Sequence, residues 1–439
     1  MPVIINSDRL NKSLLRRDAL KIIESAYDAI DIEKLVRQRF SLKSNVLEIS
    51  DLAQKKNILL KKYKRIFVIG FGKGSFAAVS KMADILGKKL YGATSLDVDS
   101  SYKPKKPNKK VTAFWGTHPT PSKENVEATT TITSIAKDAG KDDLVIYFIG
   151  GGGSSLLCGS LGELGYSGWL FKELTKKGAT INEINVVRKH ISEVKGGNLA
   201  KLTYPAESLS LIVSDVCGNP LETIASGPTI YDKSTIGDAL GVLKKYKISS
   251  ENIVFIETPK EKKYFSKCKY FLLACNQDAA LAMVNMARKL GYKSSIGSLF
   301  VKGEAKKVIF PFIKKIKNGQ AMILAGETTV VIKGKGRGGR NQELALSVIA
   351  EADNKKIDIT NLLVVSFNSD GFDNTPVAGA IADGTSLEHS KKYKLNPNKY
   401  LSNNDSFTFF KKTKDFIRVD RRAFNVADLM LILKFKKGK

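Results

Sequence analysis

The chain alternates short, almost uninterrupted apolar runs with longer stretches in which apolar residues recur every three or four positions. A strand is expected at 143–149, and its apolar run at 144–149 (LVIYFI) is typical of a strand buried on both faces of a parallel sheet, because the run carries no charged residue. The periodic stretches at 122–139 and 277–290 predict helices. Strands that alternate with helices indicate a parallel sheet with helical crossovers, so the pattern predicts an α/β fold.

The same pattern predicts the other elements. An amphipathic helix is expected at 8–30, with Leu14, Leu20, Ile23 and Tyr27 toward the core. Residues 322–325 and 328–332 are expected to form a strand pair, with Gly326 and Glu327 between the two strands. Further strands are expected at 64–70, 208–213, 270–274 and 361–367, another is expected to end near Trp115, and a helix is expected at 76–86.

One more helix is expected within 181–197, where apolar residues recur at helical spacing. Arg188, Ser192 and Lys195 share another face of this helix. Two interpretations remain open for that face: it lines a substrate cleft, or it is the solvated side of an amphipathic helix.

The length of 439 residues predicts two domains. A lysine-rich charged stretch at 249–269 interrupts the pattern, and we place the boundary there. The expected domains are 1–255, joined by the C-terminal tail at about 400–439, and 256–400.

The chain is strongly basic, with 72 Lys and Arg against 43 Asp and Glu and a formal charge of +29. This excess admits nucleic acid, acidic lipid or an anionic small substrate as partner. Many lysines lie in runs such as Lys103–Lys110 and 434–439, which we expect to be solvated surface. The informative cations are therefore the few that stand among glycines and at strand ends, and these suit a triphosphate and a small carboxylate.

Several classes of protein are excluded by composition. Four Cys without a Cys-x-x-Cys spacing and only three His provide neither a disulfide framework nor a structural zinc site, which favours a reducing cytoplasm. The apolar runs are far shorter than the roughly 18 residues of a membrane span, so we expect no transmembrane helix, signal peptide or membrane partner.

Three glycine clusters follow predicted strands or precede predicted helices: 70–74, 150–153 and 334–339. Glycine lets backbone N–H groups approach an anion closely, and a following helix adds partial positive charge. Lys73 lies inside the first cluster and Arg340 closes the third, and both suit the charge of a transferring phosphoryl group. The alternative is that the loops are tight turns and the two cations are ordinary surface residues.

Carboxylates follow several predicted strands, where α/β enzymes place their chemistry. Asp215, Glu327, Asp370 and Asp373 occupy such positions. They are candidates to hold Mg²⁺ or to accept a hydroxyl proton. A helix cap or an Asx turn is an equally good explanation for any one of them.

Taken together, these segments resemble the glycerate 2-kinase family, whose C-terminal part is known as the MOFRL domain. The resemblance extends in order from about residue 65 to 385. Its main stretches are Gly72-Lys73-Gly74, 116–121 (GTHPTP), 150–157 (GGGGSSLL), 184–197 (INVVRKHISEVKGG), 214–220 (SDVCGNP), 224–229 (IASGPT), 326–330 (GETTV), 336–346 (GRGGRNQELAL), 369–373 (SDGFD) and 378–380 (AGA).

The resemblance implies ATP- and Mg²⁺-dependent phosphorylation of D-glycerate at its 2-hydroxyl. It also implies a Rossmann-like N-terminal domain, a second α/β (MOFRL) domain and an active site in the cleft between them, and family members are often dimers. Lys73 and Arg340 match the family's catalytic pair. With the residues singled out above, the predicted site comprises catalytic Lys73, Arg340, Asp215 and Asp370; substrate-binding Lys73, Arg188, Lys195, Ser154 and Arg340; ATP-binding Gly150, Gly151, Gly152, Gly153, Ser154, Gly336, Gly338 and Gly339; and metal-binding Asp215, Glu327 and Asp370.

Two motifs depart from the family pattern. The acidic motif has Phe372 and Asn374 in place of an Ile and a Gly, and the C-terminal Thr-Gly-Thr-Asn-Val-Asn-Asp signature reads RAFNVAD at 422–428. Two other functions stay open. One is an NAD-dependent hydroxy-acid oxidoreductase that uses Gly70–Ser75 as a dinucleotide loop, with Asp97 or Asp99 on the ribose. The other is a basic protein that binds nucleic acid without catalysis.

Overall fold

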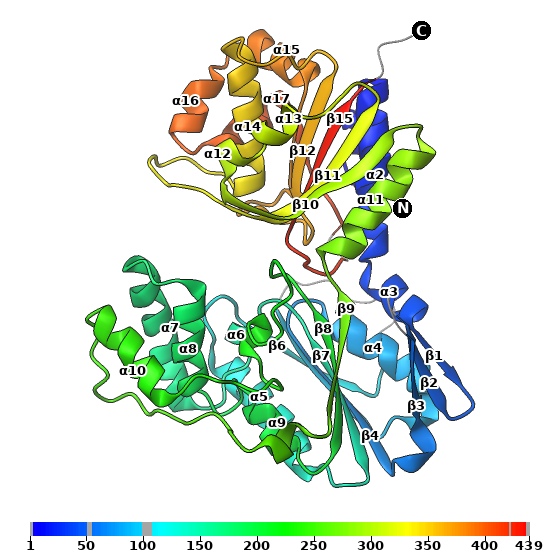
Figure 1. Ribbon diagram of the computed structural model, residues 1–439, viewed down its shortest axis with the longest axis vertical. Coiled ribbons are helices and arrows are strands. Elements are labelled where there is room, and N and C mark those ends of the chain that lie inside the picture. The colour runs from blue at the N-terminus through cyan, green and yellow to red at the C-terminus, as the bar shows by residue number, and fades with distance from the viewer. Residues whose placement is uncertain (1–2, 51–54, 99–107, 421–422, 436–439) are drawn as a thin grey trace. The chain divides into compact units, whose positions relative to one another are not determined.

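The computed structural model describes residues 3–50, 55–98, 108–420 and 423–435, and the chain divides into two compact units (Figure 1). The parallel-sheet unit comprises residues 32–215 and 219–273. The mixed-sheet unit comprises 1–31, 216–218 and 274–439. This division differs from the expected one, because residues 1–31 and the C-terminal tail both belong with 274–400.

The parallel-sheet unit is built on six strands in the order β6-β5-β4-β7-β8-β9. β4 (Arg65–Phe71) is parallel to β7 (Asp143–Ile149) along its whole length, from Arg65 opposite Asp143 to Phe71 opposite Ile149. Every residue of β7 is buried, as the continuous apolar run predicts. The other strands are β5 (Gly92–Val98), β6 (Val111–Gly116), β8 (Glu207–Val213) and β9 (Cys268–Ala274).

Helices connect these strands, which confirms the predicted α/β fold. α4 (Ser75–Leu86) packs on β4 and β5, and α5 (Lys123–Asp138) packs on β6. A small antiparallel sheet of β1 (Phe40–Lys43), β2 (Val46–Ser50) and β3 (Lys55–Leu59) adds to this unit. Its remaining helices are α3 (Ile32–Arg39), α6 (Gly153–Leu156), α7 (Leu161–Lys176), α8 (Ile181–His190), α9 (Asn198–Thr203) and α10 (Ile236–Lys245).

The helix expected within 181–197 is shorter than predicted. α8 ends at His190, whose buried ring lies within hydrogen-bond distance of the Ile256 carbonyl and the Ser234 hydroxyl. Ser192 and Lys195 therefore lie beyond the helix, and the expectation that they share a helical face with Arg188 was wrong. The chain then turns through Gly196 and Gly197, which adopt φ of 57° and 88°.

The mixed-sheet unit has the strand order β10-β11-β15-β12-β13-β14. β15 (Asp428–Lys434) lies between β11 (Gln320–Thr329) and β12 (Leu362–Asn368) and is antiparallel to both. The C-terminal tail thus supplies a central strand here, which is why it does not join the N-terminal domain. The other strands are β10 (Lys293–Glu304), β13 (Gly379–Ala382) and β14 (Phe416–Ile417).

β11 is one continuous strand, so the expected strand pair around Gly326 and Glu327 was wrong. Gly326 lies in the strand because β10 passes very close: a Cβ built on Gly326 would lie 2.2 Å from the Val301 carbonyl oxygen. The glycine is needed there for a close approach of two strands, and no turn follows from it.

Helices pack on this second sheet, among them α2 (Leu14–Ala29) and α11 (Asn276–Lys289), which lie against each other (Figure 1). Leu20, Ile23 and Tyr27 are buried as predicted, whereas Leu14 is exposed. Buried Arg16 holds α2 in place through ion pairs with Asp383 and Asp415. The remaining helices are α1 (Ser7–Leu10), α12 (Ala305–Val308), α13 (Phe310–Ile313), α14 (Arg340–Asp353), α15 (Gly384–Lys392), α16 (Pro397–Ser402) and α17 (Ser406–Thr413).

Candidate functional site

The second glycine loop follows β7 and leads into α6. Its backbone turns at Gly152, which adopts φ of 81°. A side chain at Gly152 would also be crowded, because an added Cβ would lie 3.1 Å from the His118 ring; Cγ of Lys73 would be 3.7 Å away. In the part of the chain that the structure describes, the N–H groups of Gly151 and Gly152 donate to no protein acceptor. This loop therefore presents backbone donors beside Lys73.

The first glycine loop supports the second. The Lys73 N–H donates to the Gly151 carbonyl at 2.9 Å, and the Gly150 N–H donates to the Phe71 carbonyl at 3.0 Å. Gly72 lies so close to Gly150 that an added Cβ would be 2.5 Å from its carbonyl oxygen. The structure thus places half-buried Lys73 directly against the Gly150–Gly153 loop.

The first loop does not leave its helix start open to a ligand. Buried Asp97 accepts hydrogen bonds from the N–H groups of Gly74 at 3.1 Å and Phe76 at 3.0 Å, at the start of α4. A carboxylate of the chain therefore occupies the positive end of that helix. This geometry argues against the oxidoreductase interpretation, which needs Asp97 on a ribose; Asp99 lies outside the described residues.

The third glycine loop is held by the chain itself. Lys333 and Gly334 donate their N–H groups to Asn404 Oδ1, and Gly336 donates to the Asn403 carbonyl at 2.9 Å. Lys335 N–H donates to Asn403 Oδ1 and Arg337 N–H to Asp405 Oδ1. Cβ atoms added to Gly336, Gly338 and Gly339 would lie 2.0–2.4 Å from Asp405, Ser406 and Asp373. These contacts favour a packing role for the three glycines over the predicted ATP contact.

Arg340 starts α14 and is ion-paired on two sides. Its Nε donates to Asp428 Oδ2 at 2.6 Å, and its Nη1 donates to Glu327 Oε1 at 2.8 Å. These two carboxylates raise the pKa of Arg340, although burial acts in the opposite direction as the largest single influence. Asp428 is fully buried, whereas the Glu327 side chain is half exposed. Asp428 thus fixes one edge of the guanidinium, and the other edge is held by an exposed, exchangeable partner.

Two buried carboxylates form the base of this cluster, and only Asp373 was considered from the sequence. Asp373 accepts from the N–H groups of Asn341 at 3.1 Å and Gln342 at 2.9 Å, so it caps α14. Burial and the neighbouring Asp428 raise the pKa of Asp373 to about 6. Asp428 also accepts from the side-chain amides of Asn341 at 2.9 Å and Asn368 at 3.0 Å. A local signal for Asp428 existed, since it directly precedes the apolar run 429–433 (LMLIL).

Two of the predicted metal ligands, Glu327 and Asp370, lie in the mixed-sheet unit, and the third, Asp215, lies in the parallel-sheet unit. Glu327 is engaged by Arg340, Asp370 accepts from the Phe372 N–H at 2.9 Å, and Asp215 belongs to the other unit. Within the described ranges, no group of three or more His, Cys, Asp or Glu residues has the arrangement of a metal site. A magnesium ion bound mainly through nucleotide phosphates needs only one or two carboxylates, so Asp215 and Asp370 still fit such an ion as single ligands.

Ser154, Arg188 and Lys195, all predicted to bind substrate, border one small hollow in the parallel-sheet unit. We call it the arginine hollow; it holds about 20 Å³, enough for one water-sized group. The Arg188 guanidinium lies 4.5 Å from the centre of the Phe171 ring. Among the described residues it has no carboxylate or other hydrogen-bonding partner, and burial lowers its pKa to about 10. A buried cation without a carboxylate partner makes Arg188 a candidate anion-binding group.

Lys195 borders the same hollow but is already satisfied. Its ammonium group pairs with buried Glu163 and also donates to Ser192 Oγ at 3.2 Å. It further donates to the Leu157 carbonyl at 2.6 Å. These contacts give Lys195 a structural task, and its predicted role in substrate binding stays a prediction.

Sequence reasoning missed the strained residue that holds Ser154. Ser226 and its neighbour Ala225 adopt φ of 60° and 50°, a region that residues with a Cβ rarely occupy. The Ser226 hydroxyl donates to Ser154 Oγ at 2.9 Å and lies 3.2 Å from Asn185 Oδ1. Strained backbone of this kind concentrates at functional sites, because the surrounding structure must maintain it.

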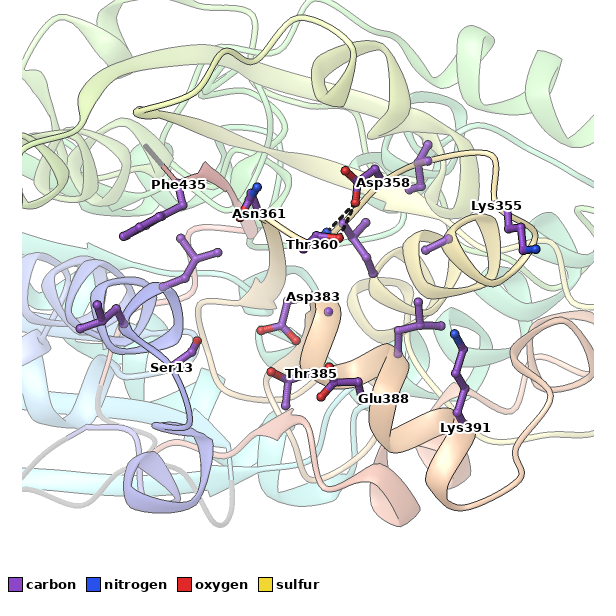
Figure 2. A pocket seen from close by; sticks show the side chains of 17 residues that line it. Ser13, Lys355, Asp358, Thr360, Asn361, Asp383, Thr385, Glu388, Lys391 and Phe435 are labelled. Atoms are coloured by element: carbon purple, nitrogen blue, oxygen red, sulfur yellow. Dashed lines mark hydrogen bonds between the residues drawn. The ribbon is translucent and has the colours of Figure 1, made fainter. Parts of the chain in front are cut away.

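A larger cavity, of about 720 Å³, lies in the mixed-sheet unit (Figure 2) and contains none of the predicted site residues. Two of its three acids are already engaged: Asp358 accepts from the Thr360 N–H and hydroxyl at 2.9 and 2.7 Å, and Asp383 pairs with Arg16. We therefore place the candidate site at the glycine loops and the arginine hollow.

The fold and these features together define a class of α/β protein with two units. One unit has a parallel sheet and a glycine loop beside a lysine, and the other has a mixed sheet and an arginine that is ion-paired with two carboxylates. Two protein-family models match the sequence. The one described as a domain of unknown function (DUF4147) matches residues 18–255, and the one for the MOFRL family matches residues 320–428. The D-glycerate 2-kinase of Thermotoga maritima is 32% identical over 87% of this chain and 93% of its own. The chain belongs to this glycerate kinase family.

Two further comparisons bear on the argument. A crystal structure of glycerate kinase from Thermotoga maritima matches with a TM-score of 0.80 at 30% identity, covering 95% of this chain and 99% of that one. An Agrobacterium vitis protein with the provisional name hydroxypyruvate reductase is 32% identical over 84% of this chain and 99% of its own. No helix within the described ranges combines the length and apolar character that crossing a membrane requires.

Proposed function

We propose that this protein is a glycerate 2-kinase, which transfers the γ-phosphoryl group of ATP to the 2-hydroxyl of D-glycerate. The observation that carries the proposal within this chain is Arg188, a half-buried guanidinium that forms no ion pair with a carboxylate among the described residues, since Glu163 at the same hollow is paired with Lys195. A small hydroxy acid supplies the missing anion, because its carboxylate matches the two-pronged donor geometry of arginine.

Lys73 and the Gly150–Gly153 loop are proposed to hold the phosphates. The open N–H groups of Gly151 and Gly152 would donate to phosphate oxygens, with Lys73 as a point charge beside them. In the transfer, the 2-hydroxyl oxygen of glycerate bonds to the γ-phosphorus, and the bond from that phosphorus to the β–γ bridging oxygen breaks. The hydroxyl proton leaves to a carboxylate, for which Asp215 and Asp370 are the candidates, and ADP is the second product.

Arg340 is proposed to stabilise the charge on the transferring group. Its Nη1 would exchange half-exposed Glu327 for phosphoryl oxygens, while buried Asp428 keeps the guanidinium oriented. Mg²⁺ is proposed to bind with the triphosphate and to take Asp215 or Asp370 as a single protein ligand. When bound, the ion would neutralise charge on the phosphates.

Two relatives with the provisional name hydroxypyruvate reductase support the oxidoreductase alternative, whereas the hydrogen bonds of Asp97 to the start of α4 argue against it. A titration with NADH and NADPH tests it directly: we expect no saturable binding, and oxidation of either cofactor by hydroxypyruvate would favour the alternative. The +29 charge keeps nucleic acid as a second alternative, although the arginine hollow, at about 20 Å³, is too small for a polymer. We also propose that the protein acts in the cytoplasm, consistent with its four free cysteines, and sedimentation would test the expected dimer.

Substrate analogues test the role of the arginine hollow. We expect D-glycerate to accept phosphate from ATP and glycerol, which lacks the carboxylate, to be a poor acceptor. The Arg188→Gln variant should lose this preference for the acid. Equal use of glycerol and D-glycerate by the native protein would contradict the proposed carboxylate site.

A further inference from the structure

A second cavity in the mixed-sheet unit has the character of an anion site. It holds about 920 Å³ and is bordered by Lys333, Lys394, Lys399 and Lys412, with Tyr393 and Tyr400. We call it the lysine hollow. It lies on the segment from α15 to α17, which packs against α14 (Figure 1), and it includes none of the residues assigned to the phosphoryl-transfer site.

The charge of the lysine hollow is only partly compensated by the protein. In the part of the chain that the structure describes, none of the four lysines forms an ion pair with a carboxylate. Lys412 instead donates to the Tyr400 hydroxyl at 2.9 Å. Asp405 is the single acid in the lining, and its Oδ1 already accepts from the Arg337 N–H at 3.0 Å and the Thr408 hydroxyl at 2.6 Å.

Lysine is abundant in this chain, so unpaired lysines alone would carry little weight. Many exposed lysines elsewhere do have acidic partners, such as Lys43 with Glu48 and Lys245 with Glu183. Here four exposed lysines border one hollow that is also lined by two tyrosines. We propose that the lysine hollow binds a small phosphorylated anion, such as a phosphate ester or pyrophosphate.

The lysine hollow is connected to the loop that precedes Arg340. Asn403 and Asp405 line the hollow, and together with Asn404 they accept every backbone N–H of residues 333–337. A bound anion would restrain residues 403–405, which we call the wall of the hollow, and with them the glycine loop that ends at Arg340. Binding at the hollow is independent of the proposed kinase function; only an effect on turnover would depend on it.

Hydrogen exchange of the full-length protein tests the site. The amides of 333–337 are all hydrogen-bonded to the wall, so their exchange reports its opening. With inorganic pyrophosphate, compared with NaCl of equal ionic strength, we expect exchange at 333–337 to slow by at least about fivefold. The triple variant Lys394→Gln, Lys399→Gln, Lys412→Gln should lose this protection.

A matched control removes the same charge elsewhere in the same unit. Lys314→Gln, Lys315→Gln, Lys317→Gln replaces three exposed lysines outside the lysine hollow, and it should keep the full protection. The phosphoryl-transfer site also attracts pyrophosphate, so a Lys73→Ala variant is measured too and should keep protection at 333–337. The proposal would be overturned if pyrophosphate does not slow hydrogen exchange at 333–337, or if the slowing persists in the triple variant of Lys394, Lys399 and Lys412. Equal loss of protection in both triple variants would also overturn it.

Discussion

Replacing Arg188 with methionine is expected to stabilise the ligand-free protein and to impair its use of glycerate. Burial lowers the pKa of Arg188 from its usual 12.5 to about 10. At 1.36 kcal/mol for each pH unit, this corresponds to a penalty of up to about 3 kcal/mol on the charged form in the folded protein. The unfolded chain binds this proton more tightly than the folded one, so the full penalty is present at every pH below about 10.

Arg188→Met removes that penalty and keeps the apolar contact with Phe171. We expect the free energy of unfolding, measured in urea at pH 7 without substrate, to rise by about 1–3 kcal/mol. Loss of two hydrogen bonds to a charged carboxylate should raise KM for D-glycerate by about 10- to 100-fold. KM for ATP should stay within about twofold, because Arg188 is assigned to the acid and not to the nucleotide.

Lys195→Met is the matched control, because Lys195 borders the same hollow. It leaves the buried Glu163 carboxylate without its partner, and we expect a loss of about 3–5 kcal/mol in stability. A gain in stability for Arg188→Met and a loss for Lys195→Met are the results expected when the first cation is unpaired and the second is paired. If Arg188→Met destabilises the protein as Lys195→Met does, or leaves KM for D-glycerate unchanged, the assignment of the arginine hollow is wrong.

Three further predictions concern the two proposed catalytic cations, buried Asp373 and the glycine loops. Lys73→Ala and Arg340→Ala should each lower kcat by at least about a hundredfold in a folded protein, since both are assigned to charge on the transferring phosphoryl group; near-normal rates, measured by ADP release, would refute that assignment. Because the pKa of Asp373 is raised above its usual 3.8, its proton stabilises the fold fully below pH 4 and this contribution is lost as pH rises through about 6. The free energy of unfolding of the native protein should therefore fall by about 1–3 kcal/mol between pH 4 and pH 6, relative to that of the Asp373→Asn variant. The exposed control Asp353→Asn should show the same pH dependence of stability as the native protein. Gly152→Ala, which adds a Cβ at a φ of 81° beside His118, should lower kcat with the fold retained, whereas Gly336→Ala should mainly reduce thermal stability because its Cβ would meet Asp405; equal loss of activity and stability in both would contradict the distinction between the two loops.

The fold was largely predictable because its strands carry strong local signals. The run that predicts a buried strand at 143–149 is β7, with the same bounds, and the alternation with helices correctly indicates the parallel sheet. The partner of each strand is a long-range property, however. β15 is a central strand of the second sheet, yet nothing near 428–434 says which sheet it joins, so the tail was expected in the other domain.

The sequence indicated which residues are candidates for the site, but it indicated less well what each of them contacts. Arg188 was singled out as a substrate contact, and the structure places it unpaired beside Ser154. A glycine-rich loop looks the same in sequence whether its N–H groups meet a ligand or the protein. The partners that distinguish the loops are distant: Asn403 and Asp405 follow the third loop by more than sixty residues, and Asp97 follows the first by more than twenty.

The central claim is tested most directly by identifying the product made from D-glycerate. The protein is incubated with ATP, Mg²⁺ and D-glycerate, ADP release is followed, and 2- and 3-phosphoglycerate are resolved chromatographically. The account predicts equal amounts of ADP and 2-phosphoglycerate, with formation of both greatly reduced in Lys73→Ala. Formation of 3-phosphoglycerate alone would contradict the position of transfer, and no ADP release with any hydroxy acid would contradict the kinase function itself.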